Sequence, residues 1–265
     1  MKKQIEEKLA TQSTIYSRLE LEWLLDHIGD TSPAIRDDLV YNSFGHAIMN
    51  QLLSKEDFLF LAKTILEKDL LFFRMPEKGD ATLTRSFTAL LIALILDADN
   101  TITSPYYHSL STEQLQIFFN HALVYLRKER DDTGWCQEKG WFHAIAHGSE
   151  LLLYAGLHDQ FPKEKLEEIW TTILTVLKRQ KKLFTAGEDK RLAYLMTHLI
   201  LQKKIQQFQV CQWIEKLDFP VQNAPDYFRR SNMENILSSL FLQLEKEGLL
   251  EHELKTSILT FWNDY

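Results

Sequence analysis

The sequence predicts an all-α protein, and three observations support this fold class. Apolar residues recur at helical spacing along most of the chain, and no segment shows sustained alternation of apolar and polar residues. Only nine glycines and six prolines interrupt the 265 residues, and no Ser-, Gly- or Pro-rich linker divides them. Because apolar residues make up 45% of the chain, a substantial core can form. We therefore expect a single all-helical domain over residues 1–265.

Start and stop signals place the helices of the N-terminal half. Gly29 is of the residue type that commonly ends a helix, and Thr31-Ser-Pro33 combines a cap with a proline at the first helical position. Capping-box patterns begin at Ser54 and Ser111. The segment between them, residues 85–97, is apolar on every side beyond its first turn, so we expect other helices to surround it. The helices expected from these signals cover residues 5–25, 35–52, 54–73, 85–97 and 111–130.

Proline and charge signals place the remaining helices. Pro162 begins a helix that a basic turn, residues 178–182, closes in agreement with the helix dipole. Pro220 and Pro225 end a short helix. The helices expected in this half cover residues 138–154, 162–178, 192–201, 206–217, 233–245 and 251–262.

The order of these helices indicates a long-period repeat. The more apolar helices begin near Tyr41, Arg85, Trp141, Arg191 and Met233, at steps of 44, 56, 50 and 42 residues. A more amphipathic, charged helix precedes each one. This alternation is typical of HEAT-like or armadillo-like stacked antiparallel helix pairs, whose period is about 40 to 47 residues. An irregular α-helical bundle is the alternative fold.

Composition restricts the function classes. The formal charge of −7 disfavours general nucleic-acid binding, which usually needs a basic excess. Cys136 and Cys211 form neither a disulfide framework nor a CxxC metal pair, which fits a reducing cytoplasm. The first residues mix acids with bases and resemble no signal peptide. The most apolar segment, residues 87–96, has about half of the roughly 20 residues that cross a bilayer. We expect a cytoplasmic protein with no membrane partner.

Residues 138–154 are the most unusual stretch of the chain. A helix here would place Trp141, Gly148 and several aliphatic side chains on one face. A glycine inside a helix costs roughly 1 kcal/mol against alanine, so Gly148 indicates close packing or binding. The opposite face would carry four polar or ionisable side chains within about 60° of arc. These are His143, His147, Glu150 and Tyr154.

Three interpretations of His143 and His147 remain open. They could fix the packing by hydrogen bonding to neighbouring helices. They could coordinate zinc or another metal together with Glu150 or with a carboxylate such as Asp131, since i and i+4 spacing suits two ligands on one helix. The glutamate that follows the first histidine in zincins is absent, however. In the third interpretation, the histidines and nearby arginines receive an anionic group.

Arg85 opens an otherwise apolar helix, and this position requires an explanation. The helix dipole favours acidic residues at a helix start, so an arginine there implies a partner. That partner is either an internal carboxylate or an anionic ligand. If the apolar helices line a groove, the candidate ligand-binding residues are His143, His147, Glu150, Arg85, Trp141, Arg191, Asp131 and Tyr154.

Five short motifs carry a family resemblance. They are Arg36-Asp37, Arg85-Ser-Phe87, Glu129-Arg-Asp131 with Gly134, Gly140-Trp-x-His-x-x-Ala-His-Gly148, and Glu188 with Arg191. Together they resemble the bacterial domain of unknown function numbered 2785, over roughly residues 19–201. The GWxHxxAHG block is the most specific part. Glu150 stands where the family usually has aspartate, which keeps the charge and lengthens the reach. The resemblance implies a compact helical domain and brings no assigned activity.

These observations favour a binding function. We expect a helical-repeat module whose groove, lined by His, Arg and Glu, takes an anionic small molecule or a protein segment. The competing function is a zinc-type hydrolase in which His143, His147 and a carboxylate hold Zn²⁺ and activate water. A metal site requires three protein ligands that converge on one ion, with nitrogens at about 2.1 Å, whereas a binding groove requires exposed, converging donors.

Overall fold

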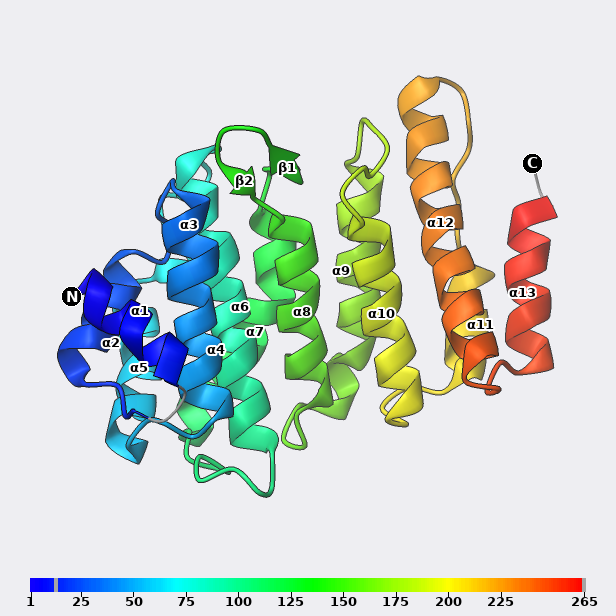
Figure 1. Ribbon diagram of the computed structural model, residues 1–265. Helices are drawn as coiled ribbons and strands as arrows, with labels where there is room; N and C mark the ends of the chain where they lie inside the picture. The colour runs from blue at the N-terminus through cyan, green and yellow to red at the C-terminus, as the bar shows by residue number, and fades with distance from the viewer. Residues whose placement is uncertain (12–13, 264–265) are drawn as a thin grey trace. The chain divides into compact units, whose positions relative to one another are not determined.

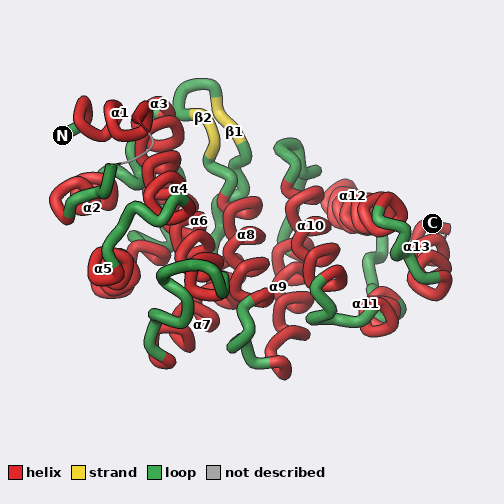
Figure 2. The backbone as a smooth tube through the Cα atoms, turned by 60° about the horizontal axis from the view of Figure 1, so that its bottom comes forward, coloured by secondary structure: helices red, strands yellow, loops and turns green. Residues whose placement is uncertain are grey.

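The computed structural model describes residues 1–11 and 14–263, and it confirms the all-α fold class (Figure 1). Among these residues the β-structure consists of one two-stranded hairpin (Figure 2). The chain divides into two compact units, Met1–Gln160 and Phe161–Tyr265. The single domain expected over residues 1–265 stays a prediction.

The first unit is built around three helices that lie side by side in chain order. α4 packs against α6, and α6 packs along α8. On their other side, α5 contacts α6 and α7 contacts α8. The elements of this unit are α1 (Lys2–Thr11), α2 (Arg18–Asp26), α3 (Pro33–Ile35), a π-helical turn η1 (Arg36–Tyr41), α4 (Asn42–Met49), α5 (Lys55–Glu67), a 3₁₀ turn η2 (Leu70–Phe72), α6 (Asp80–Asn100), α7 (Thr112–Lys128), β1 (Trp135–Cys136), β2 (Gly140–Trp141) and α8 (Ala144–Leu157).

The central helix of this unit, α6, is buried on nearly all sides, as the apolar segment at residues 85–97 predicts. Among the residues that the structure describes, it is the one helix that is long and apolar enough to cross a membrane. In the structure, 83% of the most apolar 18-residue stretch of α6 is buried.

The second unit also consists of helices packed in pairs. α10 packs along α12, and α11 packs along α13, while α9 and α13 also contact α12. α12 begins nine residues earlier than the helix predicted at Met233, because Asn223 caps it and Pro225 lies in its first turn, where proline is tolerated. The elements are a 3₁₀ turn η3 (Lys163–Lys165), α9 (Leu166–Lys178), α10 (Glu188–Leu201), α11 (Gln207–Ile214), α12 (Ala224–Lys246) and α13 (His252–Asn263).

The helix predicted over residues 138–154 is wrong at its start, where the chain forms a hairpin. β1 and β2 are antiparallel and pair Trp135 with Trp141. Gly140 adopts φ +68°, which glycine tolerates far better than other residues. A Cβ there would lie 3.0 Å from Pro33 Cγ, so the hairpin packs closely against the first residue of α3. The helix α8 begins only at Ala144.

The prediction of close packing at Gly148 is confirmed. Gly148 lies inside α8, where α8 packs against α7. A Cβ at this position would lie 2.4 Å from Leu126 Cδ2 and 3.0 Å from Tyr125 Cδ1. The missing side chain therefore allows the two helices to approach closely just below the hairpin.

Candidate functional site

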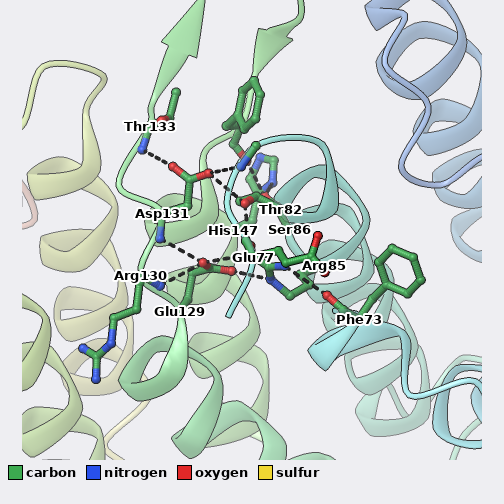
Figure 3. Close-up of polar contacts among 12 residues, drawn as sticks. Phe73, Glu77, Thr82, Arg85, Ser86, Glu129, Arg130, Asp131, Thr133 and His147 are labelled. Carbon is green, nitrogen blue, oxygen red and sulfur yellow. Dashed lines mark hydrogen bonds and ion pairs between the residues drawn. The ribbon is translucent and has the colours of Figure 1, made fainter. Parts of the chain in front are cut away.

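Arg85 is fully buried and forms an internal ion pair (Figure 3). Its Nε and Nη2 lie 2.7 and 3.0 Å from the two carboxylate oxygens of Glu129. The guanidinium also donates to the carbonyl oxygens of Phe73 and Glu77 and to the Thr82 hydroxyl, at 2.8–3.0 Å. The partner that the sequence predicts for Arg85 is thus an internal carboxylate, that of Glu129. All of these donors are bonded to protein groups, and the expected role of Arg85 in ligand binding stays a prediction.

Asp131 ties the chain before the hairpin to the start of α6. Its Oδ2 accepts hydrogen bonds from the Gly79 N–H at 2.9 Å and the Thr82 hydroxyl at 2.7 Å, and its Oδ1 accepts from the Thr133 N–H at 3.1 Å (Figure 3). Burial raises the pKa of Asp131, but the hydrogen bonds from Gly79, Thr133 and Thr82 outweigh it and hold the pKa below its usual value. These hydrogen bonds give Asp131 a structural role, and its expected role in ligand or metal binding stays a prediction.

Arg36 fixes the backbone of the hairpin. Its guanidinium is fully buried and donates to the carbonyl oxygens of Lys139 at 2.9 Å and Trp141 at 3.2 Å. A third hydrogen bond reaches the carbonyl oxygen of Asp30 at 2.9 Å, and the guanidinium lies 4.8 Å from the centre of the Phe87 ring. Arg36 therefore holds the hairpin to η1 and α6.

Arg36 also pairs with the carboxylate beside it in the sequence. Its Nε lies 2.8 Å from Asp37 Oδ1, as an ion pair whose angles are not those of a hydrogen bond. Burial raises the pKa of Asp37 by more than the charge of Arg36 lowers it. The motif Arg36-Asp37 thus forms a nearly neutral unit under the hairpin and leaves no guanidinium for an anionic ligand.

His147 is hydrogen-bonded inside the protein. Its Nδ1 lies 2.7 Å from Ser86 Oγ, which lies 2.5 Å from the carbonyl oxygen of Phe142 (Figure 3). Because a carbonyl can only accept, we assign the serine proton to this contact and a proton on Nδ1 to His147. The imidazole also meets the Phe87 ring edge to face at 5.0 Å. These contacts agree with the interpretation in which the histidine fixes packing.

His143 precedes α8 and adopts a left-handed backbone conformation with φ +48°. Its ring stacks on the indole of Trp141, with centroids 4.2 Å apart and planes inclined by 25°. The rings of His143 and His147 are 5.6 Å apart and nearly perpendicular. The two histidines therefore do not share one helix face, although the i and i+4 spacing predicts that they do.

The metal interpretation finds no geometric support. Within residues 1–11 and 14–263, no group of three or more His, Cys, Asp or Glu side chains is placed to hold a metal ion. Glu150 and Tyr154 lie half-buried further along α8, and Arg191 is exposed on α10 in the second unit. Their predicted role in ligand binding stays a prediction.

The hairpin exposes two tryptophans. Trp135 is 53% exposed and Trp141 is 43% exposed, although the helical pattern placed Trp141 on a packing face. Their ring centroids are 6.4 Å apart and their planes are inclined by 66°. We call Trp135, Trp141 and the stacked His143 the tryptophan hairpin. The glycines at positions 134 and 140 were the signal that a turn, rather than a helix, begins this stretch.

Comparison with known proteins supports the family resemblance. A family model described as "Protein of unknown function (DUF2785)" matches residues 71–242, which include α6, the hairpin and α8. No curated protein and no solved structure matches the chain.

Proposed function

The chain belongs to the DUF2785 family, whose function is unknown, and from its site we propose a recognition module that binds a protein segment at the tryptophan hairpin. One observation carries this proposal: two tryptophans lie exposed on a backbone that buried side chains hold in place. Tryptophan is enriched among the residues that dominate binding energy at protein interfaces. A fixed backbone reduces the entropy lost on binding, so such a surface is preorganised.

The buried arginines favour a protein segment over an anionic small molecule. Arg85 was one of the cations expected to receive an anion, and both Arg85 and Arg36, the arginine beside the hairpin, donate to internal groups. An exposed pair of indoles offers apolar area and ring faces instead, which suit a peptide side chain. The zinc hydrolase gains no support, since the described residues contain no three-ligand cluster.

We also propose that the helix pairs form a HEAT-like stack. In the first unit α4, α6 and α8 lie side by side in chain order, while α5 and α7 pack on their other side. The packing of α10 along α12 in the second unit follows the same order. The long-period alternation in the sequence supports this proposal, since each repeat of a solenoid contacts its neighbours in the chain.

A bacterial cytoplasm is the location we propose for the protein. Cys136 and Cys211 are both free thiols, as expected in a reducing compartment. Fractionation of cells that express the tagged full chain tests this proposal, and recovery in a membrane or secreted fraction would contradict it.

Selection of binding peptides tests the recognition function. A random peptide display library is panned against the full chain, and the affinity of enriched peptides is measured for the parent and two variants. We expect Trp135→Ala/Trp141→Ala to weaken binding at least about ten-fold, because tryptophan anchors at interfaces contribute this much or more. Trp262→Ala, which removes a tryptophan that is 51% exposed on α13, is the matched control and should bind like the parent.

Two results would reject the proposal. Either no peptide is enriched over an empty support, or the enriched peptides bind the double variant and the parent equally. Circular dichroism melting of each variant checks that the fold is retained, which we expect since both indoles lie on the surface.

A further inference from the structure

The charged side chains beside the tryptophan hairpin give this surface a net negative charge. Between residues 134 and 142 the charged side chains are Glu138 and Lys139. The Lys139 ammonium is bonded to the carboxylate of Asp80, and this pairing neutralises it. Glu138 is exposed beside the two strands, so it adds a negative charge to this surface.

Three arginines near the hairpin are turned inward or away. Arg36 and Arg85 are fully buried, and each pairs with a carboxylate, Asp37 and Glu129 respectively. The side chain of Arg130 points away from the two strands (Figure 3). A ligand at the hairpin therefore meets indole rings and a carboxylate, while the charges of Arg36 and Arg85 are already neutralised.

The ring faces of the two tryptophans suit a cation. An indole carries negative charge density over its face, which attracts ammonium and guanidinium groups. His143 stacks on Trp141 and fixes the orientation of that ring. Trp135 stands at 66° to it, so the two indoles form two inclined aromatic walls on the surface.

Resting on the recognition function proposed above, we infer that the bound segment is basic, with a Lys or Arg side chain placed over the indoles of the tryptophan hairpin. Glu138 supplies the opposite charge. Guanidinium suits the site best, because its plane can lie flat on an indole while its edge donates to a carboxylate. The formal charge of −7 favours the approach of such a segment.

Two labelled peptide pools of the same length test this inference. The pools share their randomised neutral positions and differ in the fixed central residues, which are Arg and Lys in one pool and Glu in the other. Fluorescence anisotropy with the full chain, at about 150 mM NaCl, reports affinity for each pool. We expect the basic pool to bind at least about ten-fold more tightly.

Four variants separate the site from general attraction to an acidic protein. Trp141→Ala should lower the affinity for the basic pool about ten-fold, whereas Trp141→Phe, which keeps an aromatic face, should retain most of that affinity. Glu138→Gln should lower the affinity for the basic pool about three-fold, as expected of an exposed charge pair. Glu247→Gln removes the same charge from an exposed position after α12 and should have little effect.

Each contrary outcome has a distinct meaning. Equal binding of both pools overturns the inference, and so does basic-pool binding that Trp141→Ala leaves unchanged, since that would reflect net charge alone. Tighter binding of the acidic pool that depends on Trp141 also overturns it, while the recognition function stands. If neither pool binds and display selection yields no tryptophan-dependent peptide, the recognition function itself fails.

Discussion

The Arg85–Glu129 pair is a buried ion pair in the first unit. Both side chains are almost completely buried, so removal of one leaves an uncompensated charge in the core. We expect Arg85→Ala to lower the free energy of unfolding by about 3–5 kcal/mol. Arg85→Lys should also destabilise the protein, because an ammonium cannot reproduce the two parallel bonds to the carboxylate. Urea unfolding measures both changes.

A double variant is the control for this prediction. Arg85→Met/Glu129→Leu removes both charges and should cost less than Arg85→Ala, since no buried charge stays unpaired. A loss below about 1 kcal/mol for Arg85→Ala would contradict the prediction and would mean that the pair is solvated.

Asp131 should make stability depend on pH. Its pKa is lowered in the folded protein by hydrogen bonds that outweigh burial. A carboxyl with a lowered folded pKa stabilises the protein above its unfolded pKa of about 3.9, and this contribution is lost as pH falls through the folded pKa. We expect Asp131→Asn to lower the free energy of unfolding at neutral pH and to reduce its further decrease below about pH 4. Urea unfolding at several pH values measures both effects.

Asp218→Asn is the matched control, because its side chain is exposed in the segment after α11. It should leave both the neutral stability and the acid slope almost unchanged. An Asp131→Asn variant whose acid slope equals that of the parent would show that Asp131 titrates as it does in the unfolded chain.

At this scale the sequence could indicate that Arg85 needs a partner but could not identify it. Glu129 lies 44 residues away and reaches Arg85 only after the chain has formed α7 and returned to the start of α6. Ser86 lies in one of the family motifs and His147 on the predicted polar face. Their mutual hydrogen bond depends on the carbonyl of Phe142, which the hairpin positions.

At the scale of elements, the contact of α7 with α8 should tolerate no side chain at Gly148. A Cβ there would lie 2.4 Å from Leu126 Cδ2 and 2.7 Å from its Cγ, and Leu126 is fully buried. Overpacking of this kind costs about 1–3 kcal/mol, which exceeds or cancels the roughly 1 kcal/mol gained in helix propensity. We therefore expect Gly148→Ala to lower the free energy of chemical unfolding.

Gly45 in α4 provides a control with the opposite sign. A Cβ at Gly45 would meet nothing within 4 Å, so Gly45→Ala should stabilise the protein by about 1 kcal/mol. In a Leu126→Ala background Gly148→Ala should cost less than it does in the parent, because the shorter side chain makes room. Stabilisation by Gly148→Ala would show instead that α8 can move away from α7 at little cost.

The hairpin shows why helical periodicity failed at the start of α8. Residues 138–143 fit an amphipathic helix, but such a helix would use the carbonyl oxygens of Lys139 and Trp141 in its own hydrogen bonds. In the structure Arg36, more than 100 residues away in the sequence, takes both of them. Periodicity reports local preference, and here a buried guanidinium from η1 decides the backbone conformation.

At the scale of the whole molecule, the all-α class and the burial of α6 were predictable, because both follow from apolar spacing that each helix carries in its own sequence. Such spacing does not predict whether the whole chain unfolds in one cooperative transition. Composition and the lack of a linker predict a single domain, whereas residues 1–160 and 161–265 form separate compact units. Cooperativity depends on packing between distant segments, and this packing has no local signature.

Hydrogen exchange measures this cooperativity directly. Each unit has its own core, and solenoid-like chains behave as sums of neighbouring interactions rather than as one transition. We expect Gly148→Ala to reduce amide protection in peptides from residues 1–160 and to leave those from residues 161–263 nearly unchanged. Leu237→Ala, at a fully buried position of α12, is the reciprocal substitution and should act on the second unit alone. If either substitution lowers amide protection equally throughout the chain, the protein unfolds as the single domain that its composition predicts. A single cooperative core would transmit a local loss of stability to every amide.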